Sequence, residues 1–167
     1  MRMLLIAEKR SSSDKYDFLR FVRNNGSTSA AQMPRQGILP HDLIHFVVES
    51  ALPLRHGFLS QVARGADAEY VVRQVHSYDQ ATVDIEAAQV EAIVEGLQTQ
   101  LWAGDFDNET FMAAAEAACA ARGKPAYDLS GIDVRTSLYE RALALFRQWQ
   151  ETPFHKSLSL DFHPRPV

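Results

Sequence analysis

The strongest constraint on the fold of this chain is the tripeptide Asn24-Asn25-Gly26, which lies between two segments typical of β-strands. Residues 16–23 are rich in aromatic and β-branched side chains. Asn-Gly supplies the two positive φ angles that a type I′ turn requires. We therefore expect residues 27–33 to fold back on residues 16–23 as a β-hairpin.

The loop also predicts the register of this hairpin. With Asn25-Gly26 as the two loop residues, Phe18 should face Met33 and Phe21 should face Ala30. Pro34 has no backbone N–H to donate to a neighbouring strand, so it should end the second strand.

Two shorter segments should join the hairpin in one sheet. Residues 3–7 form an apolar run, and the polar residues 11–14 after it are typical of a turn. Near the other end, residues 157–162 (Ser-Leu-Ser-Leu-Asp-Phe) alternate strictly between polar and apolar side chains. This alternation predicts a half-buried strand that returns to the N-terminal sheet.

Between these strands the apolar residues repeat at helical spacing. Pro40 suits a first helical turn, and Pro53 should stop that helix. Asp84 is a suitable N-cap for a later helix, and either Asp107 or Asn108 for the one after it. Trp102 and Trp149 fall on apolar helix faces and should belong to the core. The helices are expected over residues 40–52, 58–64, 85–102, 111–121 and 133–152, while residues 70–76 fit either a helix or a strand.

These elements predict an α+β fold in a single domain, residues 1–167. Residues 1–37 are strand-rich, residues 40–152 are mainly helical and residues 157–162 form the returning strand. We expect a small antiparallel sheet, made of the N-terminal hairpin and the C-terminal strand, with about four or five helices covering one face.

Charge and composition narrow the class of protein. The 17 Lys and Arg residues stand against 21 Asp and Glu residues, and this net charge of −4 argues against a nucleic-acid-binding protein. The single cysteine, Cys119, excludes an internal disulfide framework and a Cys-rich zinc fold. No segment approaches the roughly 20 apolar residues that span a bilayer. The expectation is a cytoplasmic protein that binds neither nucleic acid nor membrane.

Three side chains with metal-ligand chemistry share one face of the helix expected after Pro40. His41, His45 and Glu49 stand at i, i+4 and i+8, so each is rotated by only about 40° from the one before. Imidazoles at i and i+4 can bind one divalent metal, zinc being the first choice, and a carboxylate one turn on supplies a third ligand. Two histidines, one carboxylate and open positions are shared by hydrolytic zinc sites and non-haem iron sites. The sequence thus predicts a small metal-binding protein with hydrolase activity.

Further groups would complete such a site. Asp42 lies beside the helix face that carries His41, His45 and Glu49, and it is expected to orient a ligand imidazole by accepting its hydrogen bond. The fourth ligand has to come from elsewhere, and His56 and His76 are the candidates. The catalytic residues and the substrate stay unassigned.

The same residues also have a structural interpretation. Asp42 suits the positive end of a helix dipole, and His45 with Glu49 can form an ordinary i,i+4 pair. In that alternative the chain is a non-enzymatic interaction or regulatory domain. A third alternative is a subunit of a homodimer that pairs through the exposed edge of the hairpin.

The segment Leu39-Pro40-His41-Asp42-Leu43-Ile44-His45-Phe46-Val47-Val48-Glu49 resembles a helix in a group of uncharacterised bacterial proteins, which implies a shared fold. Its His-Asp-x-x-His core also resembles, over five residues, the zinc-ligand motif of the Coq4 family of ubiquinone biosynthesis. That family has a Glu twelve residues after the second His, where this chain has Gly57.

Overall fold

The computed structural model describes residues 1–75 and 84–166. The sheet is antiparallel in the order β3-β2-β1-β4, and it consists of β1 (Met3–Glu8), β2 (Tyr16–Val22), β3 (Thr28–Pro34) and β4 (Ser157–Phe162). β4 pairs with β1 along its whole length, with Phe162 opposite Met3 and Ser157 opposite Glu8. The prediction of a returning strand at residues 157–162 is confirmed.

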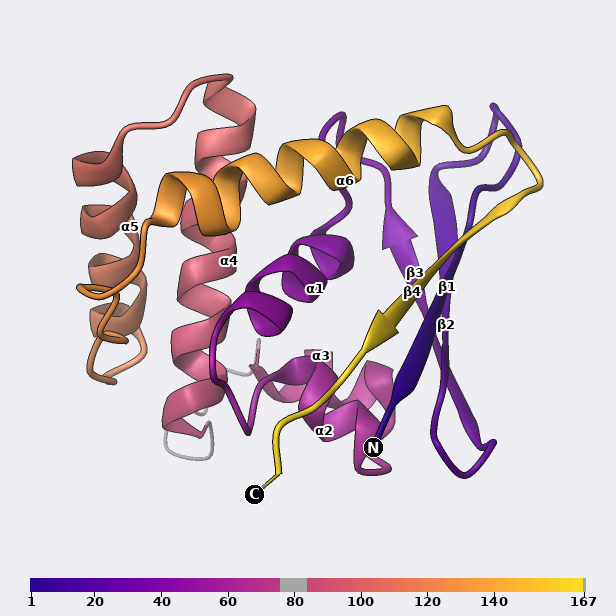
Figure 1. Cartoon of the computed structure of the whole chain (residues 1–167), viewed down its shortest axis with the longest axis horizontal. Helices are drawn as coiled ribbons and strands as arrows, with labels where there is room; N and C mark the ends of the chain where they lie inside the picture. The colour runs from indigo at the N-terminus through magenta and orange to yellow at the C-terminus, as the bar shows by residue number, and fades with distance from the viewer. Residues whose placement is uncertain (76–83, 167) are drawn as a thin grey trace.

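The helices lie on one side of this sheet (Figure 1). The π-helical segment Arg135–Tyr139 leads directly into the last of them. The segment predicted as either helix or strand is helical up to Val75, and His76 lies outside the described residues. The α+β fold is confirmed, and in the described ranges its helices are α1 (His41–Ala51), α2 (Phe58–Ala63), α3 (Ala68–Val75), α4 (Ile85–Ala103), α5 (Asn108–Ala121) and α6 (Glu140–Glu151).

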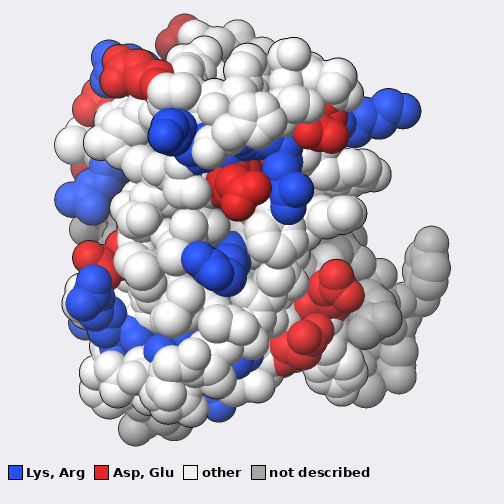
Figure 2. Space-filling model, turned by 90° about the vertical axis from the view of Figure 1, so that its right-hand side faces the viewer, with Lys and Arg blue, Asp and Glu red and all other residues white. Residues whose placement is uncertain are grey.

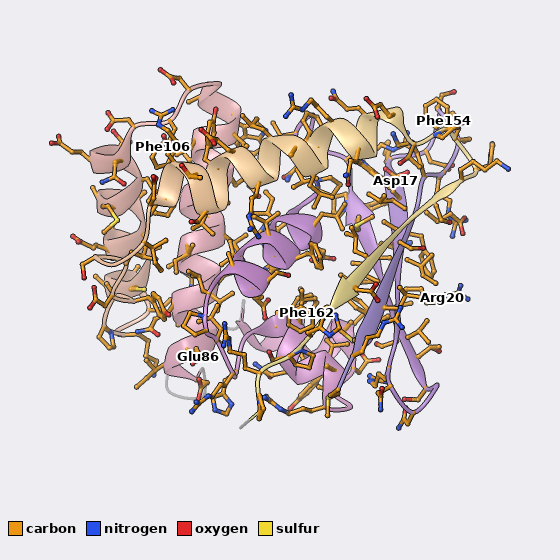
Figure 3. The ribbon with its side chains drawn as sticks, viewed as in Figure 1. Asp17, Arg20, Glu86, Phe106, Phe154 and Phe162 are labelled. Atoms are coloured by element: carbon orange, nitrogen blue, oxygen red, sulfur yellow. The ribbon has the colours of Figure 1, made fainter. Side chains whose placement is uncertain are left out.

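The two faces of the sheet differ in composition. On β1, Met3, Leu5 and Ala7 are fully buried beneath the helices, and the residues between them are half-buried on the other face. On β2, Arg20 is exposed and points away from the helices (Figure 3). The space-filling view of this side shows scattered charged side chains among mostly uncharged ones (Figure 2). The core therefore lies between the sheet and the helices.

Helix α1 lies between the sheet and α4 (Figure 1). Its first turn begins at Pro40, whose carbonyl accepts hydrogen bonds from the N–H groups of Leu43 and Ile44. Leu43, Ile44 and Val48 are fully buried, so this helix is central to the core. The 3.6-residue period that buries these side chains also places His41 and His45 on the face of α1 that is turned towards α4.

The hairpin forms as expected, but its turn and register differ from the prediction. Phe21 pairs with Ser29 and Phe18 with Gln32, which is one residue away from the expected register. The N–H of Gly26 donates to the carbonyl of Arg23, so residues 24–26 form a three-residue loop instead of a two-residue one. Gly26 has a φ of 86°, whereas Asn25 does not have a positive φ. A type I turn followed by one glycine with a positive φ connects two antiparallel strands equally well.

Asp84 and Asp107 are helix N-caps as expected, and one of the two tryptophans is placed differently. The carboxylate of Asp84 accepts a hydrogen bond from the N–H of Glu86 in α4, and that of Asp107 accepts from the N–H groups of Glu109 and Thr110 in α5. Trp149 is buried as predicted, but Trp102 is 57% exposed. The indole N–H of Trp102 donates to the carbonyl of Gln36, so the ring lies over the loop after β3 and outside the core.

Replacing Gly26 with alanine is expected to destabilise the protein by roughly 1–2 kcal/mol, because a Cβ atom is disfavoured at this positive φ. Gly131→Ala is the matched control, since Gly131 has no positive φ and an added Cβ meets nothing within 4 Å. Urea denaturation of both variants tests this. Equal unfolding midpoints for the two would contradict the assigned turn.

Candidate metal centre

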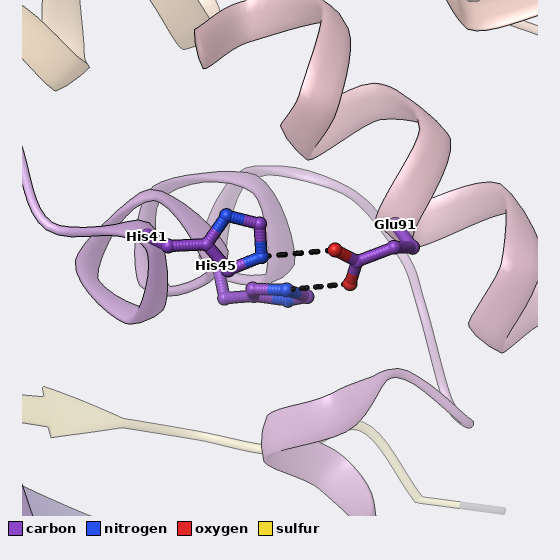
Figure 4. Close-up of side chains that lie close together, drawn as sticks. All are labelled: His41, His45 and Glu91. Atoms are coloured by element: carbon purple, nitrogen blue, oxygen red, sulfur yellow. Dashed lines mark hydrogen bonds and ion pairs between the residues drawn. The ribbon is translucent and has the colours of Figure 1, made fainter. Parts of the chain in front are cut away.

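Helices α1 and α4 bring two imidazoles and a carboxylate together. His41 and His45 lie one turn apart on α1, and Glu91 reaches them from the middle of α4 (Figure 4). Their potential ligand atoms all lie within 4.8 Å of one another. Residues far apart in the sequence thus form a group with the composition of a metal site.

Glu91 bridges the two imidazoles with its two oxygens. Nε2 of His41 lies 2.9 Å from Oε1, and Nε2 of His45 lies 2.9 Å from Oε2. The imidazole rings meet edge to face, with centroids 5.1 Å apart. Both Nε2 atoms therefore point at the same carboxylate.

The other nitrogen of each ring is also held. Nδ1 of His45 donates to Oε2 of Glu49 at 3.0 Å, and Nδ1 of His41 donates to Oε1 of Gln98 at 3.0 Å. Gln98 lies seven residues after Glu91, which places both side chains on the same face of α4. These contacts fix the orientation of both rings and present their Nε2 atoms inward.

Glu49 is itself fixed by the start of α2. Its two carboxylate oxygens accept the backbone N–H of Leu59 at 3.0 and 3.2 Å. Gly57 is the N-cap of this helix, and an added Cβ would lie 2.2 Å from Oε1 of Glu49. The absence of a side chain at Gly57 is therefore what lets the carboxylate approach α2.

This group of charges is buried at one end and open at the other. The side chains of His45 and Glu91 are each 4% exposed and that of Glu49 is 0% exposed. The ring of Phe58 packs against the imidazole of His45, with centroids 5.2 Å apart. The side chain of His41, by contrast, is 29% exposed. A ligand can therefore approach the centre from the side of His41.

Burial and charge set the protonation of the metal-free centre. Burial opposes the charged form of His45, but the carboxylates of Glu91 and Glu49 outweigh it and raise the pKa of His45 from 6.5 to about 10. Burial also opposes the charged form of His41, and Glu91 raises its pKa above 6.5. Burial opposes ionisation of Glu91, yet the two imidazoles hold its pKa well below 4.5. His45 is therefore held as an imidazolium between Glu49 and Glu91, and Glu91 also favours the charged form of His41.

An open hollow of about 550 Å³ begins at His41. It lies between the edge strand β3, the first turn of α1 and helix α3. Among the described residues it is lined by Tyr16, Ala31, Gln32, Pro34, His41, Asp42, Glu69 and Val72. Its volume is within the range usual for small-molecule sites.

The structure brings together some of the residues expected from the sequence and separates others. His41 and His45 share one centre, as predicted, but Glu91 takes the place expected for Glu49. Because His45 uses Nδ1 for Glu49 and Nε2 for Glu91, Glu49 supports the ring from behind and lies outside the group of three.

The remaining expected residues have different positions. Asp42 is half-buried and lines the hollow beside His41. His56 is exposed and borders a separate hollow with Gln61, Arg64 and Asp84, so it does not contribute to this centre. His76, the other candidate for a fourth ligand, lies outside the described residues.

Glu91 was not found from the sequence, although a signal was present. It stands in the apolar stretch Ala87 to Val94 of α4, and in the structure it is 3% exposed. An acidic residue inside the buried stripe of a helix needs a partner, because an unpaired buried carboxylate is costly. That reasoning identifies Glu91 as a residue with a partner but does not say which residue pairs with it.

Comparison of the chain with protein-family models, curated proteins and solved structures gives no match. The resemblances drawn from the His-Asp-x-x-His helix therefore stay predictions. In the described ranges, no helix has the length and apolar character needed to cross a membrane.

We expect Gly57→Ala to destabilise the protein by about 2–3 kcal/mol. The new Cβ would displace the Glu49 carboxylate from both His45 and the Leu59 N–H, leaving buried polar groups without partners. Denaturation of this variant beside Gly131→Ala measures the effect. If the two variants unfolded at the same urea concentration, the close contact between Gly57 and Glu49 would be wrong.

The stability of the metal-free protein should depend on pH through the same groups. The raised pKa values of His41 and His45 mean that their contribution is complete below about pH 6.5 and is lost as the pH rises towards 10. The lowered pKa of Glu91 means that its contribution is present above pH 4.5 and is lost on acidification.

This dependence can be measured as the difference in unfolding free energy between the wild type and Glu91→Gln. We expect the difference to be greatest between pH 4.5 and 6.5 and to decrease on either side. A difference that stayed constant from pH 4 to 10 would contradict the charge assignment.

Proposed function

We propose that this chain is a small metal-binding hydrolase in which His41, His45 and Glu91 hold one divalent cation, zinc being the first choice. The observation that carries the proposal is that both imidazoles are held through Nδ1 and present Nε2 to the same point. Histidine ligands of metals have this support from a second hydrogen-bonding group, which fixes the ring and its tautomer. The carboxylate of Glu49 and the amide of Gln98 supply it here.

The charge of the centre also favours a divalent cation. With neutral imidazoles, the carboxylates of Glu91 and Glu49 carry two negative charges in a buried environment. One divalent cation would neutralise them, as protonation of the imidazoles does in the metal-free protein. A bound metal would therefore avoid the cost of an uncompensated buried charge.

The side chains would have to adjust to hold an ion. Four tetrahedral ligands at zinc distances lie about 3.3 Å from one another. The Nε2 atoms now lie 2.9 Å from the Glu91 oxygens, while ligand atoms of the group are up to 4.8 Å apart. An ion would therefore require the bonded pairs to separate by a few tenths of an ångström and the more distant pairs to approach one another.

Hydrolysis is the activity that this ligand set supports best. Three protein ligands leave a fourth position for water, and a bound divalent metal lowers the pKa of that water so that it becomes a nucleophile near neutral pH. The exposed side of His41 opens into the hollow, where a substrate can approach.

The alternative is a non-enzymatic interaction or regulatory domain in which the same residues only join α1, α2 and α4. The observation in its favour is that both histidines and both carboxylates bond one another directly. The two proposals differ in one measurable property, which is whether the protein prefers a divalent cation to protons on its imidazoles.

Titration of metal-free protein with zinc, manganese and ferrous iron tests the proposal. We expect one zinc per chain, and no stoichiometric binding by the His41→Ala/His45→Ala double variant or by Glu91→Gln. Glu49→Gln should weaken binding by roughly 10- to 100-fold, because it supports a ligand without touching the metal. The control is His163→Ala, an exposed histidine outside the centre, which should bind as the wild type does.

Circular dichroism and urea denaturation of each variant separate loss of binding from loss of fold. Equal, weak zinc binding by the wild type and Glu91→Gln would overturn the proposal and favour the structural alternative. The hydrolase part has its own test with ester and amide substrates. Zinc-dependent turnover lost in Glu91→Gln supports it, and stoichiometric zinc without turnover contradicts it.

A further inference from the structure

Strand β4 forms one edge of the sheet and has no neighbouring strand on its outer side. Just before β4, the N–H of Lys9 donates to the carbonyl of Lys156 at 2.9 Å, so this carbonyl points towards β1. Backbone N–H and C=O groups point to alternate sides from one residue of a strand to the next. The outward N–H and C=O groups of β4 are therefore those of Ser157, Ser159 and Asp161.

This edge has little of the protection that sheet edges normally have. Prolines, lysines and covering segments usually keep a strand edge from pairing with another chain. Residues 157–162 contain neither proline nor lysine, and their one charged side chain, Asp161, is paired with Arg2. Figure 1 shows β4 with no helix or strand in front of it. In the part of the chain that the structure describes, the outward backbone groups of β4 have no hydrogen-bond partner.

The opposite edge of the sheet is less open. Helix α3 packs beside β3, where the N–H of Ala68 donates to Oγ of Ser29 at 3.0 Å. The guanidinium of Arg23 donates to the carbonyl of Thr28 at 3.3 Å, and Pro34 at the other end of β3 has no N–H to donate. Of the two edges, that of β4 is therefore the better place for a further strand.

We propose that the outer edge of β4 pairs with the same edge of a second copy of the chain, in an antiparallel register centred on Ser159. Ser159 would lie opposite Ser159 of the second copy, and Ser157 opposite Asp161 of the second copy. All three outward residues of each strand are then used, which gives roughly six backbone hydrogen bonds across a two-fold axis. The two four-stranded sheets join into one through β4, not through the hairpin edge considered from the sequence.

The apolar side chains of β4 favour its own copy as the partner. In this register, Leu158 of one chain lies opposite Leu160 of the other, on the side of the sheet that carries the helices. Both leucines are only partly buried in the single chain, so pairing would cover apolar surface that one copy leaves accessible. A shift of one residue would turn the leucines of the second copy to the opposite face of the joined sheet.

The charges at this edge are complementary when two copies run antiparallel. Lys156 immediately precedes β4 and Asp161 lies near its end, so the edge has a positive and a negative end. In the proposed register, Lys156 of one chain is next to Ser157, which lies opposite Asp161 of the other chain. The positive end of each edge therefore lies beside the negative end of the other, which favours the antiparallel pairing of two copies.

Sedimentation equilibrium of the full, metal-free chain tests the proposal. We expect a monomer–dimer equilibrium with a dissociation constant of about 0.1 mM or tighter, since a single pair of strands makes a small interface. A chain that stays monomeric at about 0.5 mM would overturn the inference. Because β4 carries no residue of the metal group, the outcome does not depend on the proposed function.

Two proline variants show which edge is used. Ser159→Pro removes the N–H at the centre of the proposed pairing without removing a hydrogen bond to β1, and it should raise the dissociation constant roughly tenfold or more. Ala30→Pro is the matched control, because the N–H of Ala30 points away from β2 at the opposite edge, and it should dimerise as the wild type does. Circular dichroism shows whether each variant folds. A dimer that is kept in Ser159→Pro would contradict the proposal.

Charge variants of Ser159 test the register, and they decide the matter where a proline variant does not fold or where both lose the dimer. The side chain of Ser159 is exposed, so Ser159→Lys and Ser159→Asp should each fold, but like charges would meet on the two-fold axis and weaken the dimer. An equimolar mixture of the two should restore association, because a lysine then lies opposite an aspartate. Ser130→Lys and Ser130→Asp, at an exposed serine outside the sheet, should dimerise as the wild type does. If the Ser159 mixture associates no more tightly than either variant alone, the proposed pairing is wrong.

Discussion

The imidazole of His45, held between the carboxylates of Glu49 and Glu91, is the interaction on which the arrangement of the helices depends. Glu49 continues the contact to the backbone at the start of α2, and Glu91 belongs to α4. Three helices are thus joined through two side chains of α1, His45 and Glu49. Because all three charged groups are nearly inaccessible to water, removing any one leaves a buried charge without its partner, a change that typically costs 3–5 kcal/mol in proteins.

In this arrangement, two adjacent faces of α1 are both buried but need different surroundings. One face of the helix supplies Leu43, Ile44 and Val48 to the core, and the adjacent face carries ionisable groups into an environment that disfavours charge. At one end of this face, the absence of a side chain at Gly57 leaves room for the carboxylate of Glu49 beside the N-terminus of α2, which favours a negative charge. At the other end, the side chain of His41 reaches the surface, so the connected group of polar side chains is in contact with solvent there.

Local patterns in the sequence predicted the elements well. The alternation at residues 157–162 identified β4, and Asp84 identified the start of α4. Of the two candidate caps for α5, Asp107 and Asn108, the structure uses Asp107. The hairpin turn was placed correctly but given two loop residues instead of three, because Asn-Gly is compatible with both loops and only the pairing of the strands distinguishes them. Trp102 was assigned to the core because the periodicity of a helix does not show where its neighbours end.

The candidate site was predicted in part for a related reason. The spacing of His41 and His45 on one helix is local information and identified both residues. Glu91 lies on a distant helix, so its contact with these histidines depends on how α4 packs across α1, which spacing does not encode. Glu49 was the nearest carboxylate on the same face, and the sequence does not distinguish a metal ligand from a residue that holds the ligand from behind.

The pairing of β4 with β1 has a consequence for the synthesis of the protein. The helical part of the chain separates β1 from β4 in the sequence, so β1 is made well before the strand that covers its free edge. Until residues 157–162 have been made, the backbone N–H and C=O groups along that edge have no strand beside them, and the core lacks Phe162. An open edge next to apolar side chains pairs readily with other chains, and such long-range pairing forms slowly. Nascent chains of this protein should therefore be prone to aggregation until β4 has been made.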